Sequence, residues 1–139
     1  MGGIKAKPKR RSGVVAVEMA LVMPIALTLI FGIMQVGYAF MIQHMLQDAA
    51  RKGCRAASFP SSSNTVVTSA VNGVLSNMKL TGVTTTILVN GAAVDVSTAS
   101  YGSTVSVSVQ IPLSNVMLFS VSFAQFTGTI QGAATIRCE

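Results

Sequence analysis

Hydrophobic and polar positions divide the N-terminal part of the chain sharply. A polar, basic leader ends at Gly13, and an apolar run then extends from Val14 to Met34 with Glu18 as its only charged residue. A run of this length matches the roughly 20 residues that an α-helix needs to cross a bilayer. Pro24 lies inside the run and predicts an interruption or a kink. We therefore predict a transmembrane helix directly after the leader.

After Met34 the pattern becomes amphipathic rather than uniformly apolar. Apolar residues recur at spacings of three and four, as on one face of a helix: Tyr38, Met41, Ile42, Met45, Leu46, Ala49 and Gly53. Polar residues fall mainly on the opposite face, where we expect solvent: Gln43, His44, Gln47, Asp48, Arg51, Lys52 and Arg55. One helix is therefore predicted over residues 14–57, ending at the Pro- and Ser-rich stretch 59–64.

The C-terminal half predicts one more helix and several strands. Residues 65–78 have roughly helical spacing, and residues 103–111 alternate strictly between apolar and polar side chains, as in a half-buried strand. Asn90-Gly91 is a strong hairpin signal. Further predicted elements are strands over 83–89, 94–97 and 127–138, and a short amphipathic helix over 114–123 docked on the membrane or on another subunit. The sequence thus predicts an α+β fold, with the long helix packed on a small antiparallel sheet.

The net charge of +6 describes the leader more than the rest of the chain. Five of the ten cations lie in residues 1–13, and the remaining chain has a net charge of +1. A basic stretch beside a membrane helix stays in the cytoplasm. We therefore predict a cytoplasmic N-terminus, an extracytoplasmic C-terminal part, and no nucleic-acid partner.

The leader and the apolar run allow three fates. The run could be a secretory signal removed on the far side, although it is longer than such signals. It could be an uncut anchor of a single-span protein whose outer domain binds a partner. Cleavage after Gly13, on the cytoplasmic side, would instead leave the run in the mature protein with a free ammonium on Val14. Only this last fate gives Gly13 and Glu18 a joint role, because the carboxylate of a neighbouring subunit could pair with that buried ammonium.

Basic residues, a glycine, and an apolar run with Glu at its fifth position resemble the class III signal of type IV pilin-like precursors. Residues 13–24 (GVVAVEMALVMP) and 47–57 (QDAARKGCRAA) together resemble the TadE-like proteins, minor pilins or pseudopilins of Tad (tight adherence) pilus systems. Met19 departs from the aromatic residue that usually follows the Glu in this family.

The resemblance implies a pilin-like fold and a function in the assembly of a Tad-type pilus for adhesion and biofilm. Gly13 and Val14 would flank the bond that a prepilin peptidase cleaves, and Glu18 would be the assembly carboxylate. Implied partners are that peptidase, the major Flp-type pilin, other TadE/TadF-type minor pilins, the inner-membrane Tad machinery and membrane lipid. The expected location is the bacterial inner membrane, with incorporation into the pilus. The expected divisions are a cleaved leader (1–13), a transmembrane half-helix (14–35), an amphipathic half-helix (36–58) and a β-rich domain (59–139).

Cys54 and Cys138 are the two cysteines, and the predicted topology places both on the oxidising side of the membrane. A Cys54–Cys138 disulfide is the first expectation for such a pair; intermolecular bridges and two free thiols are the alternatives. The spacing offers no metal site, since there is no C-x-x-C pair or histidine cluster. One His, four acids and no G-x-S-x-G string or phosphate-binding loop predict a structural protein rather than an enzyme, without catalytic residues or cofactor.

Overall fold

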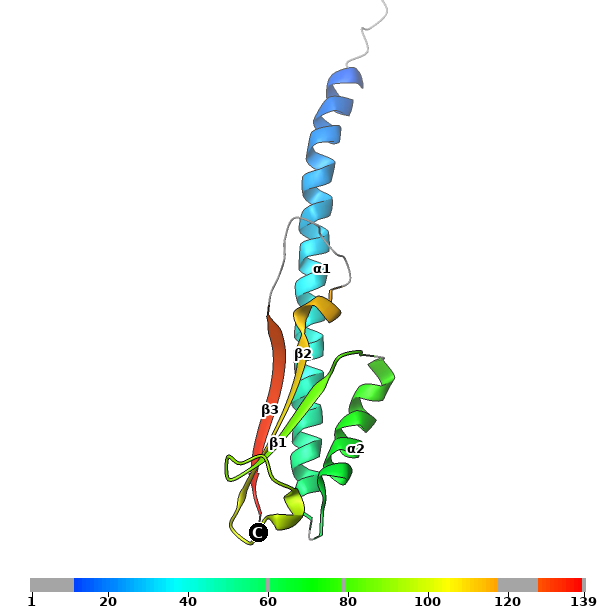
Figure 1. The fold of residues 1–139 in the computed structure, drawn as a ribbon. Helices are drawn as coiled ribbons and strands as arrows, with labels where there is room; N and C mark the ends of the chain where they lie inside the picture. The colour runs from blue at the N-terminus through cyan, green and yellow to red at the C-terminus, as the bar shows by residue number, and fades with distance from the viewer. Residues whose placement is uncertain (1–11, 60, 79, 118–127, 139) are drawn as a thin grey trace, which may run out of the picture. The chain divides into compact units, whose positions relative to one another are not determined.

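The computed structural model describes residues 12–59, 61–78, 80–117 and 128–138. The long elements are α1 (Ser12–Ala57), α2 (Asn64–Leu75), β1 (Thr84–Val89), β2 (Thr104–Pro112) and β3 (Thr129–Arg137), shown in Figure 1. Short 3₁₀ turns lie at Ser76–Met78, Val96–Thr98 and Leu113–Asn115. Contacts divide the chain into two units, Met1–Met34 and Gln35–Glu139. The predicted α+β fold, a long apolar helix with a small antiparallel sheet, is confirmed.

The helix α1 is continuous through Pro24, so the predicted interruption there is wrong. Proline removes only one backbone hydrogen bond, the one to the carbonyl of Ala20, and apolar helices tolerate that loss. The Pro24 carbonyl accepts a hydrogen bond from Thr28 Oγ1 at 2.7 Å. The apolar run and the amphipathic segment therefore belong to one helix, as predicted.

The sheet has the order β1-β2-β3, and both pairs are antiparallel. On the central strand β2, Val105, Val107, Val109 and Ile111 are fully buried, while the intervening side chains are partly exposed. The strictly alternating sequence is thus a strand with one core face and one wet face. On the wet face, hydroxyls pair across the strands, as between Ser106 and Thr135 at 3.0 Å.

Both helices of the unit Gln35–Glu139 contribute to the core over the inner face of this sheet. The buried residues of α1 are Ile42, Leu46, Ala49, Ala50, Gly53, Cys54 and Ala57. The predicted stripe is therefore correct at four positions, but the true face is turned toward Ala50 and Cys54, and Met41 is 44% exposed. The predicted second helix is confirmed as α2, which buries Val67, Val71 and Leu75.

Two glycines allow this close packing. A Cβ atom on Gly53 would lie 2.8 Å from Val71 Cγ2 of α2 and 3.2 Å from Val107 Cγ1 of β2. A Cβ atom on Gly132 of β3 would overlap the backbone of Leu46 and Gln47. The helix α1 therefore lies directly against the backbone of β3, a distance that any side chain at position 132 would prevent.

Gln47 holds α1 to the same strand through its side-chain amide. Its Nε2 donates to the carbonyl of Ala133 at 2.8 Å, and its Oε1 accepts from the Ala133 amide at 3.4 Å. Since β3 is an edge strand, these bonds satisfy backbone groups that would otherwise be open to pairing with another chain. The expectation that Gln47 lies on the solvent face is wrong for this reason.

The Asn90-Gly91 turn forms, but the predicted return strand over 94–97 does not. Asn90 and Gly91 both have positive φ, and Val89 exchanges hydrogen bonds with Ala92. The chain then leaves the hairpin, and β1 pairs with β2 instead. Instead of forming a strand, the chain makes a 3₁₀ turn over Val96–Thr98. Asp95 caps this turn, and the side chain of Val96 is buried in the core.

Other predictions concern segments that the structure describes only in part. The final strand is confirmed over Thr129–Arg137. Of the short helix predicted over 114–123, a 3₁₀ turn is present at Leu113–Asn115, and residues 118–127 lie outside the described part of the chain. Residues 1–11 of the leader also lie outside it.

Replacing Gly132 with alanine should destabilise the fold by about 1–3 kcal/mol, because the methyl group would collide with backbone rather than with a movable side chain. Gly73→Ala is the matched control: nothing lies within 4 Å of its Cβ position, and alanine favours the helix α2 by roughly 0.5–1 kcal/mol. Thermal unfolding of the full-length protein in detergent, followed by circular dichroism, measures both effects. Equal melting temperatures for the two variants would refute the close approach of α1 to β3.

Candidate functional site in the N-terminal helix

The N-terminal unit exposes its apolar side chains. Every residue from Gly13 to Met34 is exposed, including large side chains such as Leu21, Ile25 and Phe31. By length and composition, this part of α1 suffices to cross a membrane, and none of its apolar window is buried within the chain. A continuous apolar surface of this kind marks contact with lipid or with other protein.

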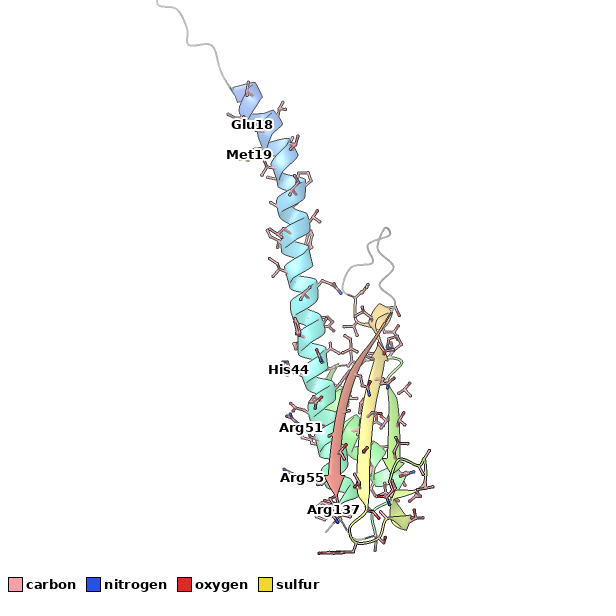
Figure 2. All side chains as sticks on the ribbon, turned by 90° about the vertical axis from the view of Figure 1, so that its left-hand side faces the viewer. Glu18, Met19, His44, Arg51, Arg55 and Arg137 are labelled. Carbon is pink, nitrogen blue, oxygen red and sulfur yellow. The ribbon has the colours of Figure 1, made fainter. Side chains whose placement is uncertain are left out.

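Glu18 is the single ionisable side chain between Ser12 and Met34. It lies in the second turn of α1 and is exposed beside Met19 (Figure 2). Among the described residues no cation forms an ion pair with it. A carboxylate on an otherwise apolar helix surface is costly to place in a membrane and usually marks function.

Gly13 and Val14 lie in the first turn of α1. A Cβ atom on Gly13 would meet nothing within 4 Å, so the fold of the chain does not require glycine there. The first amides of a helix also lack intrahelical partners, which makes this end the easiest to unwind. The bond between Gly13 and Val14 therefore lies in the exposed first turn of α1.

The second motif, residues 47–57, has a structural explanation in the other unit. Its small members Ala49, Ala50 and Gly53 are buried and allow α1 to lie close to α2 and β2. Its cations point the other way: Figure 2 shows Arg51 and Arg55 on the side of α1 opposite the sheet, below His44. Arg51 forms a weak, exposed ion pair with Asp48 at 3.5 Å. Small residues thus set the packing distance, and the charged residues remain available to solvent or a partner.

Cys54 and Cys138 are both free thiols in the structure, and the disulfide expected from the sequence stays a prediction. Cys54 is buried, and its thiol donates to the carbonyl of Ala134 at 3.1 Å. Cys138 follows Ala134 by four residues, or roughly 13 Å along an extended strand. Cys54 thus meets β3 at Ala134, four residues before Cys138.

Residues 13–55 match the family of TadE-like proteins. The match covers the apolar run, Glu18 and most of the small-residue motif, so the predicted resemblance is confirmed over this segment. Together with the exposed apolar helix, it indicates a membrane-anchored protein associated with a Tad pilus. No curated protein and no solved structure matches the chain.

The TadE-like segment ends at Arg55, two residues before the end of α1. The helix α2 and the whole sheet lie beyond it. The apolar pattern predicted the helix residues in the matched segment, but it did not indicate that Gln47 and Gly132 are packing partners. The only signal for them was a polar residue next to buried Leu46 and a lone glycine inside a predicted strand.

The two thiols should differ in reactivity. Burial raises the pKa of the Cys54 thiol, although a backbone hydrogen bond from Val107 opposes the shift, so less of it is thiolate at a given pH. Cys138 is only half-buried. We expect a maleimide to label Cys138 at least about tenfold faster than Cys54 in the native protein near pH 7.5, and both at similar rates in denaturant. Labelled peptides can be counted by mass spectrometry, with Cys138→Ser as the control. Two thiols that resist labelling until a reductant is added would show a disulfide and contradict the structure.

Proposed function

We propose that the chain is a minor pilin or pseudopilin that takes part in assembling a Tad-type type IV pilus. A prepilin peptidase cleaves it after Gly13, and the mature chain keeps the apolar helix. The observation that carries the proposal is the fully exposed apolar surface from Gly13 to Met34 with Glu18 as its one charge. The match to TadE-like proteins supports the Tad system in particular.

Different molecules surround the exposed helix before and after assembly. Before assembly, lipid of the bacterial inner membrane surrounds it, with the N-terminus in the cytoplasm and the unit Gln35–Glu139 outside. This orientation is supported by the five cations in residues 1–13. After assembly, the helices of other subunits replace the lipid. The subunits concerned are the major Flp-type pilin and other TadE/TadF-type minor pilins, delivered by the inner-membrane Tad machinery.

Glu18 sets the register in this exchange. Cleavage leaves an α-amino group on Val14 whose usual pKa of roughly 7.7–8.0 keeps it mostly protonated near neutral pH. An ammonium among apolar helices is stable only when it is paired. Glu18 of a neighbouring subunit supplies the carboxylate, so an axial offset of about four residues is selected. The protein acts structurally in this account and needs neither a cofactor nor a catalytic side chain.

Replacing Glu18 with Gln should leave cleavage intact but reduce incorporation into the pilus more than about tenfold, since an unpaired buried ammonium costs roughly 3–5 kcal/mol. The measurement is the amount of the subunit in pili sheared from a deletion strain complemented with each variant. Met19→Leu is the matched control, because it changes the neighbouring exposed position without a charge.

Normal incorporation of the Glu18→Gln variant would refute the ion-pair mechanism. A wild-type protein that stays in the membrane and never enters sheared pili would favour the other reading of the sequence. In that reading, the chain is an uncleaved single-span protein whose outer domain binds a partner.

A further inference from the structure

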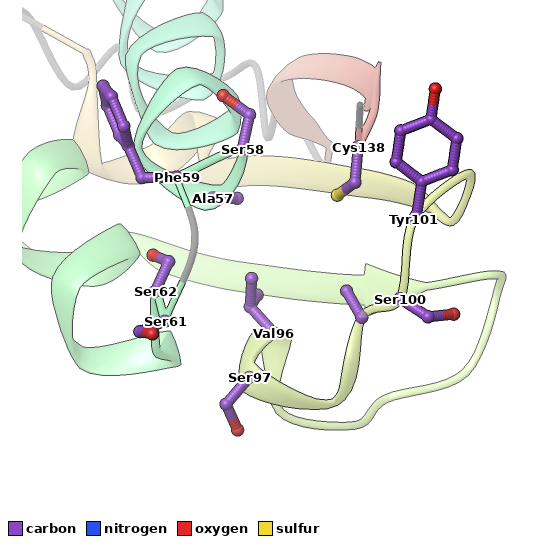
Figure 3. Close-up of a pocket in the computed structure, with 11 residues that line it drawn as sticks. Ala57, Ser58, Phe59, Ser61, Ser62, Val96, Ser97, Ser100, Tyr101 and Cys138 are labelled. Atoms are coloured by element: carbon purple, nitrogen blue, oxygen red, sulfur yellow. The ribbon is translucent and has the colours of Figure 1, made fainter.

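A cavity of about 190 Å³ lies at the end of the unit Gln35–Glu139 where α1 terminates. Figure 3 shows its walls: the end of α1 with the following turn, the loop around Val96 and Ser100, and Cys138 after β3. An engineered protein cavity of roughly 150 Å³ accepts a benzene molecule. The cavity is therefore large enough for a single six-membered ring.

Among the residues that the structure describes, the lining carries hydroxyl groups and no charged side chain. Its polar side chains are those of one tyrosine and five serines: Tyr101, Ser58, Ser61, Ser62, Ser97 and Ser100. A hydroxyl can donate and accept hydrogen bonds, so this lining suits a ligand that does both. Because none of the described lining residues carries a charge, they offer no ion-pair partner to a phosphate, a carboxylate or an amine.

Ser62 supplies the most specific evidence. Its side chain is only 6% exposed, and its Oγ atom has no hydrogen-bond partner in the described part of the chain. Leaving a buried hydroxyl unpaired costs roughly 1–3 kcal/mol. Because this atom has almost no accessible surface, a ligand hydroxyl in the cavity recovers that free energy once the Ser62 side chain rotates toward it.

Two aromatic side chains lie on opposite sides of the cavity. Phe59 is 66% exposed and Tyr101 is 87% exposed (Figure 3). Aromatic faces attract the positively polarised C–H groups of a saturated ring. The loop that carries Tyr101 is fixed, because the Gly102 amide donates to the Cys138 carbonyl at 2.8 Å and the Cys138 amide donates to the Ser103 carbonyl at 2.8 Å.

The opposite wall is fixed to the start of α2. The Val96 amide donates to Asn64 Oδ1 at 3.1 Å, and Asp95 Oδ2 accepts from the Asn64 amide at 3.4 Å. Hydrogen bonds from the backbone and side chain of Ser97 lower the pKa of the Asp95 carboxyl, which favours the ionised form of this cap. The cavity is thus bounded by segments that are held in place before any ligand arrives.

We propose that this cavity binds one ring of a neutral saccharide, with Phe59 and Tyr101 against its C–H faces and Ser62 bonded to a ring hydroxyl. The site lies about 33 Å along α1 from Gln35, at 1.5 Å per residue, and thus at the far end of its unit. Recognition of sugars there does not depend on cleavage after Gly13 or on Glu18.

Saturation-transfer NMR on the full-length protein in a detergent without a sugar headgroup tests the proposal. The probes are the methyl glycosides of glucose, galactose, mannose and N-acetylglucosamine, each at about 10 mM, because single-ring affinities near 1 mM are expected. At least one should show saturation of its ring protons. Tyr101→Ala and Phe59→Ala should each weaken that binding about three- to tenfold.

Two further variants separate binding from folding. Val94→Ala removes a side chain that is 42% exposed and does not line the cavity, so it should bind like the wild type. Ser62→Ala should keep the melting temperature, because its hydroxyl has no partner to lose, and yet weaken binding. The proposal fails if none of the four glycosides shows saturation, or if Tyr101→Ala and Val94→Ala bind equally well.

Discussion

The helix α1 exposes a continuous apolar surface between Gly13 and Met34, and this surface determines which partners the protein needs. A single copy cannot bury it, because every described contact that forms the core lies in the unit Gln35–Glu139. Lipid or other subunits must therefore cover it. The exposed carboxylate of Glu18 on this surface adds a second demand, since its cover must also supply a cation or a route to water. An assembling pilus subunit meets both demands with one interface.

The remainder of α1, in contrast, packs against the small sheet of its own chain. Small residues provide the solution. Gly53 admits Val71 and Val107, Gly132 admits the helix backbone, and Gln47 completes the exposed edge of β3. The residues that set this distance come partly from the TadE-like segment and partly from the sheet beyond it. The same helix therefore joins a region shared with that family to a domain that the match does not cover.

Sequence reasoning predicted the elements whose pattern is strong and local. The apolar run, the alternation from Val105 to Ile111 and the Asn90-Gly91 turn all appear in the structure.

Prediction from the sequence was wrong where a contact between distant segments decides the structure. The predicted return strand after Gly91 does not form, because Asp95 caps a 3₁₀ turn at Val96 instead. Asp95 also accepts a hydrogen bond from the Asn64 amide, a distant partner that no local pattern reveals. The backbone of α1 at Leu46 and Gln47 lies against Gly132, a long-range contact that no periodicity along α1 reveals. For the candidate site, Gly13, Val14 and Glu18 could be named from the sequence because their meaning lies in spacing along one helix. The serine-lined cavity could not, because its walls come from segments far apart in the chain.

The central claim is that the apolar helix becomes the N-terminus of the mature subunit. Its most direct test is the intact mass and N-terminal sequence of the protein purified from membranes of cells with and without a prepilin peptidase. The account predicts a chain that begins at Val14 when the peptidase is present and an uncut chain when it is absent. A chain that begins at Met1 or Gly2 in both strains would contradict the account.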